Sequence, residues 1–162
     1  MAQLVDESQL MYDNWEPKTK NRFLLTIDGI PSFIIKTAGR PKFTSNRIVI
    51  DHINTQRYLK GKTVWETIGI TLYDPISPSG TQATMEWLRL HHESATGRDG
   101  YNDFYKKDIG VLVLGPSGDK VEQWTLKGTF MTDGDFGDLD WADDEPLDIQ
   151  LTLSYDYALL QY

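Results

Sequence analysis

The stretch from residue 147 to 157 alternates strictly between apolar and polar side chains, and this period limits the possible folds more than any other feature. One side of the stretch carries Leu147, Ile149, Leu151, Leu153, Tyr155 and Tyr157. The other side carries Asp148, Gln150, Thr152, Ser154 and Asp156. Successive side chains of a β-strand point to opposite faces, so the pattern predicts a strand with one buried and one polar face. A chain with such a strand must supply other elements to cover its apolar face.

Further segments have the patterns of strands, and one has the pattern of a helix. The strands are expected at residues 22–27, 32–36, 43–53, 64–73, 106–114 and 120–130. Asp28-Gly29 predicts a hairpin between the first two, and residues 115–119 predict a hairpin between the last two. Residues 55–62 are basic and polar, which predicts an exposed hairpin tip or a long loop. An amphipathic helix is expected at residues 81–94, with Ser79 or Thr81 as its cap.

These elements predict a mainly β fold. About seven strands with hairpin connections favour an antiparallel β-barrel or sandwich, with one flanking α-helix and a long extended loop. A length of 162 residues favours one domain. We expect that domain at residues 21–162, after a polar N-terminal arm at residues 1–20.

Composition excludes several classes of protein. The chain has no cysteine, which excludes disulfides, thiolate catalysis and zinc–cysteine sites. Its first twenty residues lack a basic region followed by an apolar stretch, so we expect no signal peptide. No apolar run approaches the roughly 20 residues of a membrane helix. The sequence therefore predicts a soluble chain that does not insert into a membrane.

The net charge of −8 is unevenly distributed. Residues 128–162 contain nine acids and no Lys or Arg, whereas residues 36–62 contain seven bases and the single acid Asp51. Such asymmetry either steers association or reflects two solvated surfaces of different charge. The basic and acidic segments are candidates for a complementary pair of contact surfaces.

Motifs for catalysis or metal binding are not found. His91 and His92 are adjacent, so on a helix they point about 100° apart and are poorly placed to share a metal. An EF-hand read from Asp133 would place Gly137 at its fifth position and Asp144 at its twelfth, which breaks the pattern. We therefore expect no enzyme activity, no cofactor and no metal site. Loose cation binding, a glycosidase-like carboxylate pair and base stacking on Phe43 and Tyr58 are the weaker alternatives.

Several segments together resemble the tail tube proteins of contractile-tailed, myovirus-type bacteriophages. Residues 21–30 are similar to the first hairpin of that family, and residues 58–74 to its extended loop and central strand. Residues 85–88 are similar to its single helix. Leu139-Asp140-Trp141, followed by residues 149–157, is similar to its closing strand. The resemblance covers residues 21–162 and rests on the order, the spacing and the total length of these segments.

The resemblance implies a structural subunit that forms hexameric rings, stacked into a tube with a channel for passage of the genome into the host. Its implied partners are other copies of itself, a sheath protein, a tape-measure protein, a baseplate tube initiator and a tail terminator. DNA would pass through the lumen without specific binding. The implied location is the phage tail of a virion, assembled in the bacterial cytoplasm. By position, residues 43–62 would reach the neighbouring ring.

Two groups of site residues follow as hypotheses. Contacts between rings or subunits are expected from Arg40, Lys42, Arg47, Arg57, Tyr58, Lys60 and Lys62. An acidic lumen or interface is expected from Asp133, Asp135, Asp138, Asp140, Asp143, Asp144 and Glu145. Carboxylates in the lumen would repel phosphates and speed the passage of DNA.

Other readings of the sequence stay open. The same fold would serve a tube-initiator or terminator paralogue that forms one ring and does not extend. It would also serve the tube of a contractile injection system that carries protein. A β-sandwich carbohydrate-binding module or enzyme is the alternative from another class. Trp65, Trp87 and Trp124 are expected in the core or between subunits, and not on such a module's binding platform.

Overall fold

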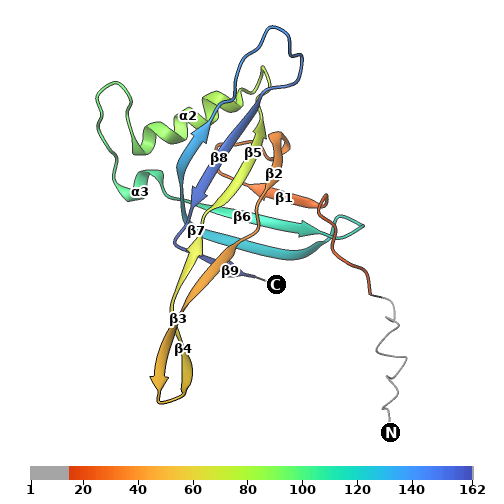
Figure 1. The fold of residues 1–162 in the computed structure, drawn as a ribbon. Coiled ribbons are helices and arrows are strands. Elements are labelled where there is room, and N and C mark those ends of the chain that lie inside the picture. The colour runs from red at the N-terminus through yellow and green to blue at the C-terminus, as the bar shows by residue number, and fades with distance from the viewer. Residues whose placement is uncertain (1–14, 162) are drawn as a thin grey trace.

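The computed structural model describes residues 15–161 as a mainly antiparallel β protein with two α-helices (Figure 1). The strands are β1 (Phe23–Thr26), β2 (Ile35–Ala38), β3 (Lys42–His52), β4 (Thr55–Glu66), β5 (Ile68–Tyr73), β6 (Lys107–Leu114), β7 (Lys120–Asp135), β8 (Asp148–Ser154) and β9 (Tyr157–Leu160). The helices are α2 (Gly80–His91), α3 (Asn102–Tyr105) and the short 3₁₀ helix η1 (Ser32–Ile34). The predicted fold class is confirmed, although the described strands close no barrel.

Strand β7 belongs to two layers. In the larger sheet the strand order is β1-β6-β7-β8-β5-β2, and β9 also pairs with β7. The first part of β7 lies between β6 and β9, and its last part pairs with β8. In Figure 1, β6 and the start of β7 run across the view, whereas β5 and β8 run up it. The sheet is therefore folded over on itself, and β1 and β2 are the end strands of this order, each paired on one edge alone.

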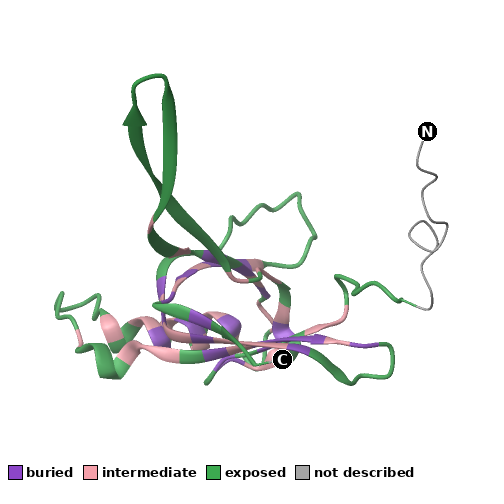
Figure 2. Cartoon of the chain, turned by 90° about the horizontal axis from the view of Figure 1, so that it is seen from below, coloured by how far each residue is buried: buried purple, intermediate pink, exposed green. Residues whose placement is uncertain are grey.

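The core lies between the two layers. The predicted alternation of the closing strand is confirmed, since Ile149, Leu151 and Leu153 are buried. The strand was predicted to run on to Tyr157, which is wrong. The chain leaves β8 at Ser154, and Tyr157 begins β9 on a different part of β7, where it is 46% exposed. Figure 2 shows buried positions along both layers and none along the β3–β4 pair.

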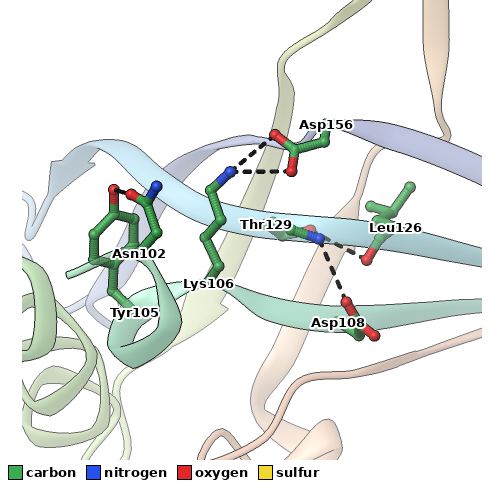
Figure 3. Close-up of polar contacts among 8 residues, drawn as sticks. Asn102, Tyr105, Lys106, Asp108, Leu126, Thr129 and Asp156 are labelled. Atoms are coloured by element: carbon green, nitrogen blue, oxygen red, sulfur yellow. Dashed lines mark hydrogen bonds and ion pairs between the residues drawn. The ribbon is translucent and has the colours of Figure 1, made fainter.

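A bulge bends β7 where it passes from one layer to the other. The register with β6 shifts between the pairs Lys107–Thr129 and Ile109–Leu126, and Gly128 has a φ of 64°. Asp156 closes the bend from the other side, because its N–H donates to the Lys127 carbonyl over 2.9 Å. Its carboxylate accepts two 3.0 Å hydrogen bonds from Lys106 (Figure 3).

Asp108 holds the same bend from β6. Its carboxylate accepts from the Lys127 ammonium over 2.6 Å and from the Gly128 N–H over 3.4 Å. The hydrogen bond from Lys127 is the main cause that lowers the pKa of Asp108. Two carboxylates on neighbouring segments therefore fix the backbone where β7 turns.

The predicted first hairpin is wrong. Asp28-Gly29 does form a tight turn, but the only pairing across it is a bridge between Ile27 and Ile30. Strand β1 pairs with β6, and β2 pairs with β5, so the two segments run to opposite ends of the sheet. Residues 32–34 form η1, where a strand was expected. The local turn signal was right, but each segment buries its apolar side chains in a different layer.

The segment at residues 55–73 also differs from its prediction. Residues 55–62 are part of strand β4, where a hairpin tip or loop was expected, and the turn lies at Ile53 and Asn54. The strand expected at residues 64–73 is interrupted at Thr67, between β4 and β5. The interruption separates a strand outside the body, with Val64 51% exposed, from a strand in the core, with Ile68 at 4%.

The amphipathic helix is confirmed as α2, with slightly different ends. The Ser79 hydroxyl accepts from the Gln82 N–H over 3.3 Å and caps the start, as predicted. The helix ends at His91 instead of residue 94, and Trp87 anchors it in the core. The short helix α3 was not predicted. Its carbonyl at Tyr105 accepts from the Trp87 indole over 2.8 Å.

Residues 1–14 of the expected N-terminal arm lie outside the described residues. Among residues 15–161, none of the helices has the length and apolar character needed to cross a membrane.

We predict that Gly128→Ala lowers the free energy of unfolding by at least about 1 kcal/mol, because an L-residue is strained at a φ of 64°. The added Cβ would also overlap the Asp156 carboxylate and disturb its pairing with Lys106. Urea denaturation measures the effect. Gly118→Ala is the matched control, since its φ is 82° but nothing lies within 4 Å of the added Cβ. Equal losses in the two variants would show that the contact with Asp156 is unimportant.

Candidate assembly site

The β3–β4 hairpin projects from the body and pairs with no other strand of the described chain (Figures 1 and 2). Every residue of β3 is exposed, and eight large apolar side chains of the hairpin and its turn are exposed. They are Phe43, Ile48, Val49, Ile50, Ile53, Tyr58, Leu59 and Val64. An isolated two-stranded hairpin is marginally stable in water, and exposed apolar patches of this kind mark contact surfaces. The hairpin is therefore a candidate contact surface.

The two faces of the hairpin differ. The register places Ile48 opposite Leu59 and Ile50 opposite Arg57, so these side chains share one face. The other face carries Arg47 opposite Lys60, and Val49 opposite Tyr58. The Arg47 guanidinium lies over the Tyr58 ring, 4.4 Å from its centroid. One face is thus mainly aliphatic, whereas the other is cationic and aromatic.

The hairpin kinks near its middle. The register shifts between the pairs Ser45–Thr63 and Arg47–Lys60, so β4 carries the bulge, where Gly61 and Lys62 lie opposite the single residue Asn46. A Cβ on Gly61 would lie 3.0 Å from the Asn46 carbonyl oxygen, which explains glycine at this position. The bulge shifts the side-chain alternation of β4 by one residue, and so sets which β4 side chains share a face with those of β3 at the tip.

An aromatic cluster fixes the root of the hairpin to the body. Phe43 and Trp65 make an edge-on contact with ring centroids 5.6 Å apart, and Trp65 lies 6.0 Å from Tyr155. The Tyr155 hydroxyl accepts from the Lys42 N–H over 3.2 Å. Lys42 also pairs with Glu66 across the hairpin at 3.0 Å. The direction in which the hairpin leaves the body is therefore determined by packing.

The structure brings all seven predicted basic-group residues to the hairpin or its root. Arg40 and Lys42 lie at the root with carboxylate partners. Arg47 and Tyr58 stack on each other, and Arg57, Lys60 and Lys62 lie on β4. Arg47 directly faces Lys60, and like charges opposite each other destabilise a free hairpin. Whether these residues contact another subunit stays a prediction.

The seven predicted acidic residues lie at the other end of the molecule (Figure 1). Asp133 and Asp135 end β7, and the others lie in the loop before β8. All seven are exposed, and within residues 15–161 none of them takes part in an ion pair. Asp135, Asp140 and Asp143 accept backbone N–H bonds two residues ahead, which shapes the loop as successive turns.

Glu122 is a functional candidate that the sequence analysis did not select. It is 4% exposed, and its carboxylate accepts from Arg40 over 2.5 Å, from Lys18 and from the Trp124 indole. These donors come from the segment before β1, from the connection between β2 and β3, and from β7 itself. A carboxylate on the same strand face as Trp124 and Leu126 was the signal in the sequence. Glu122 ties the N-terminal segment and the root of the hairpin to the core.

The pKa of Glu122 reflects opposing effects. Burial raises the pKa of the carboxyl, but the hydrogen bonds from Lys18, Trp124 and Arg40 outweigh burial and lower it to about 2. The ionised form is therefore the one that the folded chain stabilises.

Within residues 15–161, no three His, Asp or Glu side chains are placed to hold a metal ion together. The exposed acids of the loop before β8 are thus separate carboxylates, and they do not form a preformed metal site.

Comparisons with known proteins give no match by sequence, either to protein-family models or among curated proteins. Solved structures do match. The chain in the cap of the anti-feeding prophage, a tube-terminating cap, gives a TM-score of 0.74 at 17% identity, over 95% of this chain and 97% of that one. A chain of the sheath–tube complex of the extracellular contractile injection system PVC gives 0.71 at 15% identity, over 98% and 99%.

This chain has the fold of contractile-system tube components. A more distant match, Hcp1 from Flavobacterium johnsoniae, gives a TM-score of 0.51 at 13% identity, over 86% of this chain and 94% of that one. The resemblance to tail tube proteins is confirmed at the level of the fold. The named neighbours are tube or cap components and not enzymes.

We predict that Glu122→Gln lowers the free energy of unfolding at pH 7 by about 1–3 kcal/mol, because hydrogen bonds to a charged partner are lost. The folded-state pKa is lowered from 4.5 to about 2, so the carboxylate contributes stability above pH 4.5 and loses it as the pH falls toward 2. Urea denaturation between pH 2 and 7 should show a flatter pH dependence in the variant. Glu86→Gln, at an exposed position of α2, is the control. A pH dependence unchanged from that of the parent chain would contradict the assigned role of Glu122.

Proposed function

We propose that this chain is the structural subunit of a contractile tail tube, in which hexameric rings stack around a channel for passage of a genome. The observation that carries the proposal is the β3–β4 hairpin, which exposes apolar side chains on a projection of a tube-type fold. Exposing such a surface to water costs free energy in a free subunit, and burial between copies would remove that cost. The proposed role is structural and needs no catalytic group.

The shape of the subunit supports stacking. The hairpin and the acidic loop, residues 136–147, lie at opposite ends in Figure 1, so a contact that uses one end must find a different surface on the next copy. Heterologous contacts of this kind generate rings or open-ended polymers. In this proposal the hairpin residues Arg47, Arg57, Tyr58, Lys60 and Lys62 contact the neighbouring ring, and Arg40 and Lys42 hold its root.

The remaining expectations enter as parts of the proposal. A sheath, a baseplate initiator, a terminator and a tape-measure protein would be the partners of the tube within a phage tail. Unpaired acids that face the lumen would repel phosphate groups and prevent DNA from binding there. The described domain serves as one building block of the tail. The tail assembles in the bacterial cytoplasm and is released as part of the virion.

A second role is favoured by the similarity to the chain in a tube-terminating cap. A terminator has the same subunit fold but forms one ring that does not extend. Similarity to injection-system chains also makes a tube that carries protein, and not DNA, a specific alternative. These roles differ in what is added to the ring and in what passes through it.

Negative-stain electron microscopy of the purified chain across a concentration series tests the proposal. We expect hollow tubes or six-fold rings, with tube length increasing with concentration. Single rings that never extend would favour the cap. A monomer at every concentration, even with preformed baseplate as nucleus, would refute the tube proposal.

We predict that Ile48→Glu raises the concentration needed for assembly at least about tenfold, because it removes apolar contact from every subunit and adds a charge. Ile48 is 50% exposed in the subunit, so the fold itself should tolerate the change. Sedimentation velocity measures assembly, and thermal denaturation checks the fold. Leu90→Glu, at a 42% exposed position of α2, is the matched control. Equal effects of both substitutions on assembly would show that the hairpin is not part of the interface.

A further inference from the structure

The open seam of the sheet forms a groove between its two end strands. Phe23 of β1, Thr37 and Ala38 of β2, and Val111 and Val113 of β6 line it, together with residues 18–22. Its volume is about 640 Å³, and Val111 and Val113 are 2% and 7% exposed. Pockets of about 300–1,000 Å³ with apolar linings are the size that binds organic groups. The groove therefore has room for large side chains against an apolar floor.

The rim of this groove is positively charged. Its cations are Lys18, Lys20, Arg22, Lys36 and Arg40. Three neighbouring carboxylates partly neutralise them: Glu122 pairs with Lys18 and Arg40, Asp148 with Lys36, and Glu16 with Arg22. The five cations thus exceed their three partners by two charges. Lys20 forms no ion pair with any residue between 15 and 161.

The acidic loop, residues 136–147, has the complementary character. Trp141 is 106% exposed and Leu139 is 85% exposed, between the acids Asp138, Asp140 and Asp143. Trp is the side chain most often found as a dominant contact at interfaces, and it is rarely left in full contact with water. Since Trp141 is fully exposed, it does not fill the groove of its own chain. Trp141 is thus a large apolar side chain that residues 15–161 leave uncovered.

We propose that the groove of one subunit binds the acidic loop of a second copy, with Trp141 and Leu139 on the apolar floor and the loop acids beside the rim cations. The inference rests on the proposed function and adds a particular contact to it. The loop and the groove are different surfaces, so the contact is heterologous and propagates from copy to copy.

The groove is a better binding surface for this loop than the cationic face of the hairpin is. The cationic face of the hairpin is a two-stranded ribbon on which Arg47 already stacks on Tyr58. The groove combines a concave apolar surface with net positive charge, and Trp141 with its acidic neighbours needs both.

Disulfide trapping tests the contact cleanly, because the full chain has no cysteine. A Leu139→Cys chain keeps Trp141, and a Thr37→Cys chain places a thiol on exposed, groove-lining β2 without changing a charge. The two chains are mixed as monomers, allowed to assemble, oxidised and separated on a non-reducing gel. We expect Leu139→Cys to cross-link with Thr37→Cys at least about tenfold more than with Ala95→Cys, an exposed position after α2.

A second substitution tests whether Trp141 binds the groove or the loop merely lies near it. Trp141→Ala in the Leu139→Cys chain should lower the cross-link yield about tenfold at equal subunit concentration, as expected of a dominant contact. An unchanged yield would show that the loop lies near the groove without binding it, and would overturn the inference.

The remaining outcomes distinguish this inference from the function on which it rests. Tubes or rings in which Leu139→Cys does not cross-link with Thr37→Cys would overturn the inference and leave the tube proposal standing. Preferential cross-linking of Leu139→Cys with a Lys60→Cys chain would have the same meaning. Absence of any assembly would count against both. A Thr37→Cys thiol that is protected from reagent in the monomer, and released by deletion of residues 1–14, would show that the chain fills its own groove and that the inference is wrong.

Discussion

The bend of β7 at Gly128 is the constraint on which the rest of the structure depends. One strand pairs with β6 and β9 before the bend and with β8 after it, so both layers of the core share a single backbone. Asp156 holds the bend through Lys106 (Figure 3), and Asp108 holds it through Lys127. Buried strands cannot leave backbone groups unpaired, and the bulge is how β7 changes partners while both layers stay hydrogen-bonded.

The folded-over sheet explains both candidate contact surfaces. Because the sheet does not close, β1 and β2 leave a seam between them, and the apolar floor of that seam comes from β6 beneath it. Because β3 and β4 pair only with each other, their side chains beyond the root at Trp65 lie outside the core of the subunit. A protein that worked as a monomer would gain nothing from these features, whereas both are expected in a subunit that completes its packing with neighbouring copies.

Glu122 connects these surfaces mechanically. Its partner Arg40 begins the segment that leads into the hairpin, and Lys18 belongs to the segment that lines the groove. In the proposed assembly the position of the hairpin matters as much as its composition, since ordering a loose element on binding costs free energy. The buried carboxylate of Glu122 with its three donors, together with the aromatic cluster at the hairpin root, reduces that cost.

Sequence patterns alone predict the strands with strong period-2 alternation, the capped helix at α2 and the separation of basic from acidic residues. These follow from side-chain alternation and local capping, which need no knowledge of distant partners. Pairing was decided by the tertiary structure: Asp28-Gly29 formed its turn, yet β1 and β2 went to opposite ends of the sheet. Three further features depend likewise on contacts between segments far apart in the sequence. They are the burial of Glu122, the β4 strand at residues 55–62 and the groove between β1 and β2. Local patterns fix what each segment prefers to be, whereas only the folded chain determines which surfaces remain uncovered.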